Sequence, residues 1–322
     1  MSFRFFSRSE LGRCECCPRN CRVDRTRGER GVCGIGECAQ VAHHGLHFGE
    51  EPPISGQRGS GAIFFSGCNL RCVFCQNHQI SQGALASSSR RHCDEELADL
   101  MLELQAAGAH NINLVSPSHV IFQIADAIEM ARNQGLRIPI VYNSGGYDSV
   151  AALRRIAGLI EIYLPDLKYA NSSLARTLSK ASDYPQVARA AISEMFAQVG
   201  ELRCDADGIA RGGLLVRHLV LPGQLENSKA CLRFLAELSC DIHLSIMSQY
   251  TPREGTNTIS GLERGVSEEE YEEICETALE LGLTNAFVQE LSSQGNYLPD
   301  FERKSPFEPR SGSEVEVKST LG

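Results

Sequence analysis

The sequence predicts an α/β fold: a partial (βα)6 barrel of the TIM type, preceded by a cysteine-rich metal knuckle. From residue 61 onward, short apolar runs alternate with amphipathic helical patterns, which is typical of right-handed parallel β–α units. Six such units make an open, partial barrel. Most of the 14 cysteines precede residue 76, and residues 10–60 hold too few apolar residues to order themselves without a bound metal.

Six apolar, β-favouring runs predict the strands of the barrel. They cover residues 61–66, 111–116, 138–143, 159–165, 213–220 and 242–247. Residues 286–288 predict a further edge strand. The Asp207-Gly208 dipeptide predicts the turn of a small hairpin over residues 201–212, inserted before the fifth strand.

The patterns between these runs predict helices that cover the sheet, because their apolar residues recur at intervals of three and four. The expected helices span 94–108, 118–135, 148–158, two segments within 172–199, 227–238 and 267–282. The first three begin at helix-capping residues and end at a glycine that can adopt the left-handed conformation.

We expect three regions along the chain, which at 322 residues can bury a sizeable core. Residues 1–60 form the knuckle and residues 61–298 the partial barrel. Residues 299–322 are charged and rich in Ser, Pro and Gly, so they predict a mobile C-terminal tail.

The composition limits the classes of function. A net charge of −9 argues against non-specific nucleic-acid binding and against an anionic membrane surface. No apolar run approaches the length of a membrane span, and Met1 to Arg13 lacks the apolar region of a signal peptide. Without export, disulfides are not expected, so we predict reduced thiols, metal ligation and a cytoplasmic location.

The N-terminal cysteines predict a small metal-stapled knuckle. Its expected ligands are two close thiols, a third nearby and a fourth a dozen residues on: Cys14, Cys17, Cys21 and Cys33. Cys16 and Cys38 are spare and could substitute. The metal is zinc or a second iron–sulfur cluster, and spacing does not decide between them. The alternative is a loop with free cysteines.

The loop after the first predicted strand carries Cys68, Cys72 and Cys75, and no cysteine follows until Cys93. Thiolates are the ligands of iron–sulfur clusters and of zinc. The motif offers three thiolates and leaves one coordination position open, which catalytic metal sites keep and structural sites close. The alternative is a structural zinc site that borrows Cys93 or a histidine.

Polar residues follow nearly every predicted strand, at the edge where parallel barrels place their chemistry. Buried polar side chains must be paired, so their recurrence predicts a polar cup facing the cysteine loop. Any single one could instead be a satisfied core or capping residue. The residues lie at 113–119, 143–146, 166–168, 217–218 and 249–250.

The spacing of Cys68, Cys72 and Cys75, with Phe74 just before the last, resembles the signature of radical S-adenosylmethionine (SAM) enzymes. The resemblance implies that three thiolates hold three irons of a [4Fe–4S] cluster, while SAM chelates the fourth. It further implies that SAM is cleaved reductively to methionine and a 5′-deoxyadenosyl radical, which abstracts hydrogen from an unidentified substrate.

Within this superfamily the chain is similar to the activating enzymes of glycyl-radical proteins, and above all to the uncharacterised subfamily called pyruvate formate-lyase activating enzyme-like. The shared features are Cys-Pro-Arg-Asn-Cys at 17–21, Glu50-Glu51-Pro52, Asp-Leu-Lys at 166–168, Arg-His-Leu-Val-Leu-Pro-Gly at 217–223 and Gln-Tyr-Thr-Pro at 249–252. Two departures are the absence of Gly-Gly-Glu-Pro after the second strand and of an inserted ferredoxin-like domain after Cys75.

The resemblance also implies a set of SAM contacts. The backbone around Phe74 would contact adenine, and Asn143 and Ser144 would reach the ribose. Because Gly-Gly-Glu-Pro is absent, the amino group would fall to Asn113, Ser116 or Ser118. Asp166, Lys168 and Arg217 would bracket the polar ends of SAM, since a guanidinium suits a carboxylate.

The implied partners are a small electron donor such as flavodoxin or ferredoxin and an unidentified substrate, either a small molecule or a protein or peptide. Activation of a glycyl-radical protein is one such role. The rival hypothesis is a non-catalytic iron–sulfur or zinc module for binding or electron transfer. Neither hypothesis involves nucleic acid or a membrane.

Overall fold

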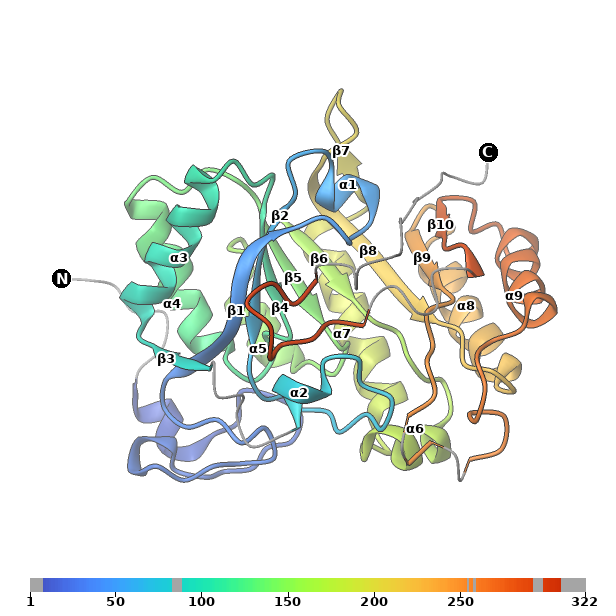
Figure 1. The fold of residues 1–322 in the computed structure, drawn as a ribbon, viewed down its shortest axis with the longest axis horizontal. Helices are drawn as coiled ribbons and strands as arrows, with labels where there is room; N and C mark the ends of the chain where they lie inside the picture. Colours follow the sequence, from blue (N-terminus) through green and yellow to red (C-terminus); the bar gives the residue numbers. More distant parts are fainter. Residues whose placement is uncertain (1–7, 83–88, 254, 257–258, 292–297, 308–322) are drawn as a thin grey trace.

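The computed structural model describes residues 8–82, 89–253, 255–256, 259–291 and 298–307. Its centre is one open sheet with the strand order β10-β9-β8-β6-β5-β4-β2-β1-β3 (Figure 1). Parallel pairing runs from β2 through to β10, in sequence order. The parallel strands are β2 Ser60–Phe65, β4 Ile112–Val115, β5 Ile140–Ser144, β6 Ile162–Pro165, β8 Ala210–Leu219, β9 His243–Met247 and β10 Ala286–Val288. The predicted α/β partial barrel is confirmed.

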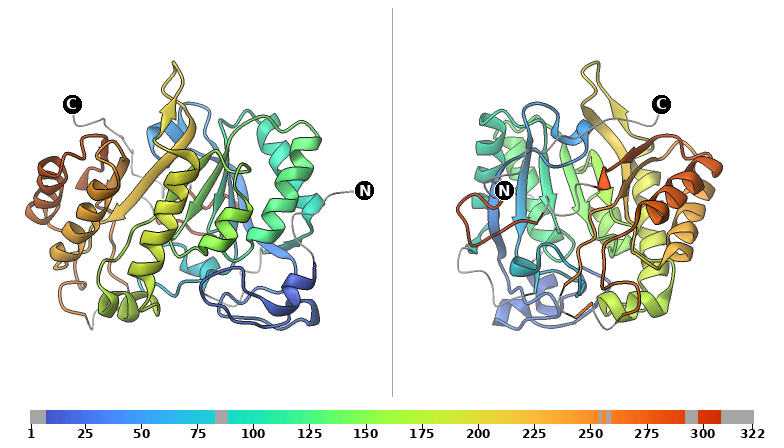
Figure 2. Two further views of the ribbon diagram at one scale, coloured as in Figure 1. Left: turned by 180° about the vertical axis from the view of Figure 1, so that it is seen from behind. Right: turned by 45° about the vertical axis from the view of Figure 1, so that its right-hand side comes forward.

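Helices cover one face of the sheet, as the reversed view in Figure 2 shows. They are α3 Asp94–Ala106, α4 Ile121–Asn133, α5 Val150–Arg155, α6 Ser172–Ser179, α7 Tyr184–Val199, α8 Leu225–Leu238 and α9 Glu268–Glu280. Ile63 and Phe65 of β2 pack with the helices in the main core, whereas Ala62 and Phe64 belong to a separate cluster on the opposite face. We call this opposite face the inner face. Within the described residues, none of the helices has the length and apolarity that crossing a bilayer requires.

Most predicted helices and strands lie within a few residues of their expected bounds. The segment 172–199 is divided into α6 and α7, as predicted. The hairpin also forms, with β7 Arg203–Cys204 pairing antiparallel to the start of β8. Its second arm is continuous with the fifth predicted strand, so β8 begins at Ala210 rather than at 213.

Two antiparallel strands extend the sheet where the sequence had suggested none. The strand β1, Ala39–His47, pairs with β2, and β3, Arg90–His92, pairs with β1. The end of β1 carries histidines and a glycine rather than an apolar run, so its pattern gave no strand signal. The short helix α1, Pro52–Ser55, follows β1 and brings Glu50 and Glu51 to the inner face.

Residues 298–307 pack onto the protein, which differs from the mobile tail predicted from residue 299. Phe301 is only 3% exposed, because it packs against Phe64 of β2. Aromatic burial therefore outweighs the charged composition of this segment. Residues 308–322 of the predicted tail lie outside the described residues.

Candidate active site

The three clustered cysteines lie in the loop that follows β2, at the carboxyl edge of the parallel strands. Gly67 turns the chain into this loop with φ +76°, and a Cβ there would lie 2.5 Å from the carbonyl oxygen of Cys33. The loop is fixed to the end of α6 by hydrogen bonds from Arg71 N to Ser179 O (3.3 Å) and from Val73 N to Leu178 O (2.8 Å). The backbone thus holds the cysteines at the edge where parallel barrels place their chemistry.

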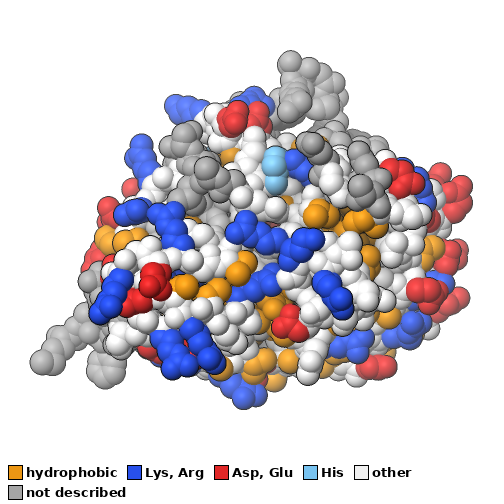
Figure 3. All heavy atoms as spheres, turned by 90° about the horizontal axis from the view of Figure 1, so that it is seen from below, with side chains coloured by type: hydrophobic (Ala, Val, Ile, Leu, Met, Phe, Trp, Pro, Cys, Tyr) orange, Lys and Arg blue, Asp and Glu red, His pale blue; other side chains and the backbone are white. Residues whose placement is uncertain are grey.

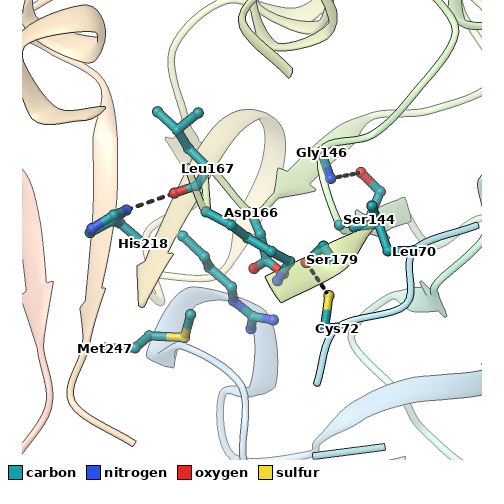
Figure 4. A network of polar contacts seen from close by, with 12 residues as sticks. Leu70, Cys72, Ser144, Gly146, Asp166, Leu167, Ser179, His218 and Met247 are labelled. Carbon is teal, nitrogen blue, oxygen red and sulfur yellow. Dashed lines mark hydrogen bonds and ion pairs between the residues drawn. The ribbon is translucent and has the colours of Figure 1, made fainter. Parts of the chain in front are cut away.

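Each cysteine sulfur has a polar neighbour. The Ser179 hydroxyl donates to Cys72 Sγ at 3.0 Å, as Figure 4 shows. The backbone N–H of Leu70 donates to Cys68 Sγ at 3.4 Å, and Cys75 Sγ lies 3.2 Å from Ser81 Oγ. Such contacts stabilise negative charge on sulfur and orient it.

Burial keeps two of these thiols protonated when no metal is bound. It raises the pKa of Cys68 to about 12, with a further contribution from Cys72. It raises the pKa of Cys72 to about 11, against the opposing effect of the Lys168 ammonium. A bound metal would displace both protons, because only thiolates ligate metals.

The donor set fits an iron–sulfur cluster in its chemistry. It offers three thiols on one loop with hydrogen-bond donors beside them, as cluster thiolates require. In the part of the chain that the structure describes, no three or more Cys, His, Asp or Glu side chains already surround one point as metal ligands would.

Asp166 and Lys168 follow β6 and form an ion pair, and Lys168 acts on Cys72 of the cysteine loop. Burial alone would lower the pKa of Lys168, but Asp166 and Cys72 raise it above its ordinary value. The ammonium therefore stays charged next to the thiols. A cation in this place can balance the negative charge of a thiolate-bound cluster.

Arg217 of β8 is held on the inner face by two carboxylates of its own chain. Its Nε donates to Glu51 Oε1 at 2.8 Å, and its Nη2 pairs with Glu51 and Glu50. The Arg217 side chain is 13% exposed, and those of Glu50 and Glu51 are 8% and 7%. Burial alone would raise the pKa of Glu51, but the guanidinium holds it below its ordinary value. Arg217 was predicted to bracket a polar end of SAM, and in the structure its guanidinium is paired with Glu50 and Glu51.

Asn113 of β4 presents a buried acceptor with no partner. Its Nδ2 donates to Glu50 Oε1 at 2.8 Å, which fixes the orientation of the amide. Its Oδ1 is buried and lacks a hydrogen-bond partner among the described residues. An unpaired buried carbonyl is costly, so it suits the ammonium group of a ligand. Asn143 of β5 lies next to this group, with its Oδ1 3.5 Å from Arg217 Nη1.

Other predicted SAM contacts are placed differently. The Ser144 hydroxyl donates to Asp148 Oδ2 at 2.6 Å, on the helix side of the sheet, so it does not join Asn143 on the inner face. Ser116 adopts φ +59° directly after β4. The Phe74 ring is buried against Tyr250, with 5.9 Å between the ring centroids.

A buried arginine, Arg25, lies among the N-terminal cysteines, next to Cys16 and to Cys33 of the predicted set. The Arg25 Nη2 lies 3.6 Å from Cys16 Sγ and 3.5 Å from Cys33 Sγ, while Cys14 Sγ lies 3.5 Å from Cys16 Sγ. The hydrogen bond with Cys16 lowers the pKa of Cys14 to about 6, although burial opposes it. The predicted spare Cys16 therefore lies at the centre of the group.

Cys21 instead accepts a hydrogen bond from Val32 N at 3.4 Å. Asn20 and Arg22, on either side of it, have φ angles of +43° and +57°. These left-handed residues turn the chain locally, which spacing alone could not reveal.

Cationic side chains surround the cysteine loop on its outer side. Arg19 donates to Asn69 O at 2.7 Å and to Lys180 O at 2.6 Å, and Arg253 donates to Cys75 O at 3.2 Å. Figure 3, which views the molecule from below, shows Lys and Arg side chains gathered across this side. The local charge therefore differs in sign from the net charge of −9.

The fold and the site together define a class of protein: an open, parallel α/β barrel with a three-cysteine loop at its carboxyl edge. No family model matches the chain. Its fold is similar to that of a radical SAM methyltransferase from Sphaerobacter thermophilus, with a TM-score of 0.50, 16% identity and coverage of 71% of this chain and 66% of that one. The chain thus spans just under two thirds of that enzyme, and the likeness shows a shared fold.

Two further similarities complete the comparison. The chain is 28% identical over 272 residues to the uncharacterized protein MJ0674 of Methanocaldococcus jannaschii, which covers 82% of this chain and 74% of that protein. A domain of a pyruvate-formate lyase-activating enzyme from Bacteroides vulgatus matches with a TM-score of 0.38 and 16% identity, over 53% of this chain and 92% of that one.

Sequence reasoning gave no role to several residues that shape the site. Glu50 and Glu51 belong to a motif shared with the similar family, and two adjacent acidic residues before a proline were the only hint that they pair with an arginine. Ser179 could not be foreseen as a partner of Cys72, because 107 residues separate them. Arg25 gave no signal, since a charged side chain is rarely buried.

Proposed function

We propose that the chain is a radical SAM enzyme in which Cys68, Cys72 and Cys75 hold a [4Fe–4S] cluster with one iron left open for SAM. The observation that carries this proposal is the three-thiol loop at the carboxyl edge of the parallel strands, beside an inner face lined with polar groups. When bound, the cluster and SAM would supply one-electron cleavage of SAM and hydrogen abstraction from a substrate.

The chain's own residues would bind and orient these groups. Ser179 and the Leu70 N–H donate to the thiolates, and Lys168 balances their charge. Asn113 Oδ1 is the acceptor for the SAM amino group, in preference to Ser116. Asn143 is the ribose contact, since Ser144 bonds Asp148. Arg217 would reach the SAM carboxylate only if its ion pair with Glu50 or Glu51 were broken.

The cationic side of the cysteine loop suits an acidic electron donor such as flavodoxin or ferredoxin. Complementary charge steers such encounters and brings the donor to the edge nearest the cluster. We further propose a reducing, cytoplasmic setting, in which thiols stay available as metal ligands.

For the N-terminal knuckle we propose a second metal, zinc or an iron–sulfur cluster. The contacts of Cys16 with Cys14 and of Arg25 with Cys16 and Cys33 support it, and Arg25 would have to withdraw from the sulfurs on binding.

For the substrate, activation of a glycyl-radical protein is one form of this chemistry. It is supported by the motifs at 166–168 and 249–252, which border the cysteine loop. Against the effect of burial, the Lys168 ammonium acts to lower the pKa of Cys72, and Gln76 Nε2 donates to Gln249 O at 3.0 Å.

The test is anaerobic reconstitution with iron and sulfide, followed by electron paramagnetic resonance of the reduced protein. We expect a [4Fe–4S] signal that changes on addition of SAM and is lost in Cys72→Ala. The matched control Cys93→Ala, at an exposed cysteine, should behave as wild type. A cluster whose signal ignores SAM would indicate an electron carrier, and a colourless zinc protein would indicate a structural module.

A further inference from the structure

Residues 298–307, here called the C-terminal loop, fold into a closed turn. Asp300 N donates to Pro306 O at 3.0 Å, and Arg303 N donates to Asp300 O at 3.0 Å. The Asp300 carboxylate also accepts from Glu302 N at 3.2 Å. The turn brings Phe301 and Phe307 together, with 5.8 Å between their ring centroids.

These two rings lie on the inner face of the sheet, where Figure 1 shows the dark red segment crossing in front of the strands. Phe301 and Phe307 pack against Phe64 at centroid distances of 5.6 and 5.0 Å. Phe307 also lies 4.3 Å from the ring of His47 and 5.9 Å from that of His43. Buried aromatic side chains bury a large apolar area, and their ring pairs add further stabilisation.

A single side chain recognises the backbone of the loop. Gln79 Oε1 accepts from Phe301 N at 2.8 Å, while Gln79 Nε2 donates to Asp300 Oδ1 at 3.2 Å. Gln79 belongs to the short helix α2, His78–Ser81, which begins three residues after Cys75. The loop is therefore held as a peptide ligand is held, by a side-chain amide and an aromatic surface, next to the cysteine loop.

The loop also covers the polar interior. His47, beneath Phe307, has its Nε2 4.0 Å from Glu50 Oε1, and Glu50 pairs with Arg217. A large ligand approaching the interior past Phe64 would meet Phe301 and Phe307 first.

We propose that Phe64, His43, His47 and Gln79 form a binding site for an aromatic peptide segment, and that the C-terminal loop is its intramolecular ligand. The external ligand is a peptide turn with two aromatic side chains and an acidic residue just before the first of them. A tether raises the local concentration of the loop to about millimolar or more, so an external peptide binds only when it outcompetes the loop or when the loop is released. This inference goes beyond the proposed enzyme function and does not depend on it, because the contacts involve neither cluster nor SAM.

The test uses a fluorescein-labelled peptide of residues 298–307, Leu-Pro-Asp-Phe-Glu-Arg-Lys-Ser-Pro-Phe, and fluorescence anisotropy with the full-length protein. The variant Phe301→Ala/Phe307→Ala releases the loop, and we expect it to bind the peptide at least about tenfold more tightly than wild type. Adding Gln79→Ala should weaken that binding. The control Phe48→Ala, at a phenylalanine that is 58% exposed, should bind like wild type.

A second measurement keeps the loop in place. The sequence contains no tryptophan, so Phe307→Trp provides a single reporter in an otherwise intact chain. Excess unlabelled peptide should shift its emission to the red as the loop is displaced, and the same peptide with both Phe replaced by Ala should not. Equal peptide binding by wild type and the released variant, or an emission unchanged by excess peptide, would overturn the proposal and show a permanent structural cap. Neither readout requires a cluster, so failure here would leave the proposed enzyme function standing.

Discussion

The buried group of Arg217, Glu50 and Glu51 allows a quantitative prediction. Replacing Arg217 by Met retains an unbranched, uncharged stem but leaves two buried carboxylates without their cation. Breaking a buried ion pair from one side costs roughly 3–5 kcal/mol. With 322 residues and an unfolding entropy of about 2.1 cal/mol/K per residue, each kcal/mol lowers the Tm by roughly 1.5 °C. We therefore expect Arg217→Met to lower the Tm by about 4–7 °C near neutral pH.

The pH dependence of the Tm identifies the unpaired Glu51 carboxylate as the cause of the stability loss. In the wild type the pKa of Glu51 lies below its ordinary value, so its carboxylate stabilises the fold above the ordinary carboxyl range, and this stabilisation is lost as pH falls through the lowered pKa. In Arg217→Met the opposing guanidinium is gone, so burial, the largest influence on Glu51, raises that pKa. Lowering the pH from about 7.5 to about 5 should then protonate the carboxylate and narrow the Tm difference between variant and wild type.

The assay is thermal unfolding followed by circular dichroism at both pH values. The double variant Arg217→Met/Glu51→Gln should recover part of the lost stability, because one unpaired charge is removed. The matched control is Arg154→Met, which breaks an ion pair with Glu194 whose arginine is 68% exposed, and should change the Tm by less than about 2 °C. A Tm loss in Arg217→Met that is no larger than in this control, or that grows toward acid pH, would refute the reasoning.

Three further predictions concern the cysteine loops. Ser179→Ala removes the hydrogen bond to Cys72 Sγ and should lower the midpoint potential of the reconstituted cluster, whereas Ser179→Thr should preserve that potential. A redox titration measures the potentials, and equal values in wild type and both variants would show that this hydrogen bond does not act on the cluster. Cys17→Ala should lower the content of bound metal or the Tm without changing the rate of SAM cleavage per cluster. If metal analysis and thermal unfolding show an unchanged metal content and Tm, the knuckle is not a metal site. Gly67→Ala forces a Cβ to within 2.5 Å of Cys33 O at φ +76°, so it should reduce iron incorporation. The control Gly208→Ala, whose Cβ would meet nothing within 4 Å, should not reduce it. Equal iron content in the two variants would contradict the close packing of the cysteine loop.

The sheet and its covering helices could be predicted because their signals are local. Strands such as Ile162–Pro165 are buried on both faces, and their residues form a continuous apolar run. The strand β1 gave no such signal, since His43, His44 and Gly45 interrupt its pattern and its place depends on pairing with β2. Tertiary pairing determined this strand, not local propensity.

The cysteine loop could be predicted from spacing, but the partners of its neighbours could not. Arg217 was recognised as a polar residue near a strand end, yet Glu51 lies 166 residues away and is brought to it only by β1 and α1. Cys16 rather than Cys21 lies beside Arg25, and the sequence does not mark the left-handed conformation of Asn20 and Arg22 on either side of Cys21. The turn that buries Phe301 lies within a charged segment, so composition pointed away from it.

The central claim is that three thiols of one loop support the cleavage of SAM. The most direct measurement is chromatographic quantification of 5′-deoxyadenosine after anaerobic incubation of the reconstituted protein with SAM and a strong reductant. We expect repeated turnover by the wild type and by Cys93→Ala, and none by Cys72→Ala. A reconstituted wild-type protein that carries its iron and sulfide yet leaves SAM intact, or a Cys72→Ala variant that cleaves it equally well, would rule out this mechanism.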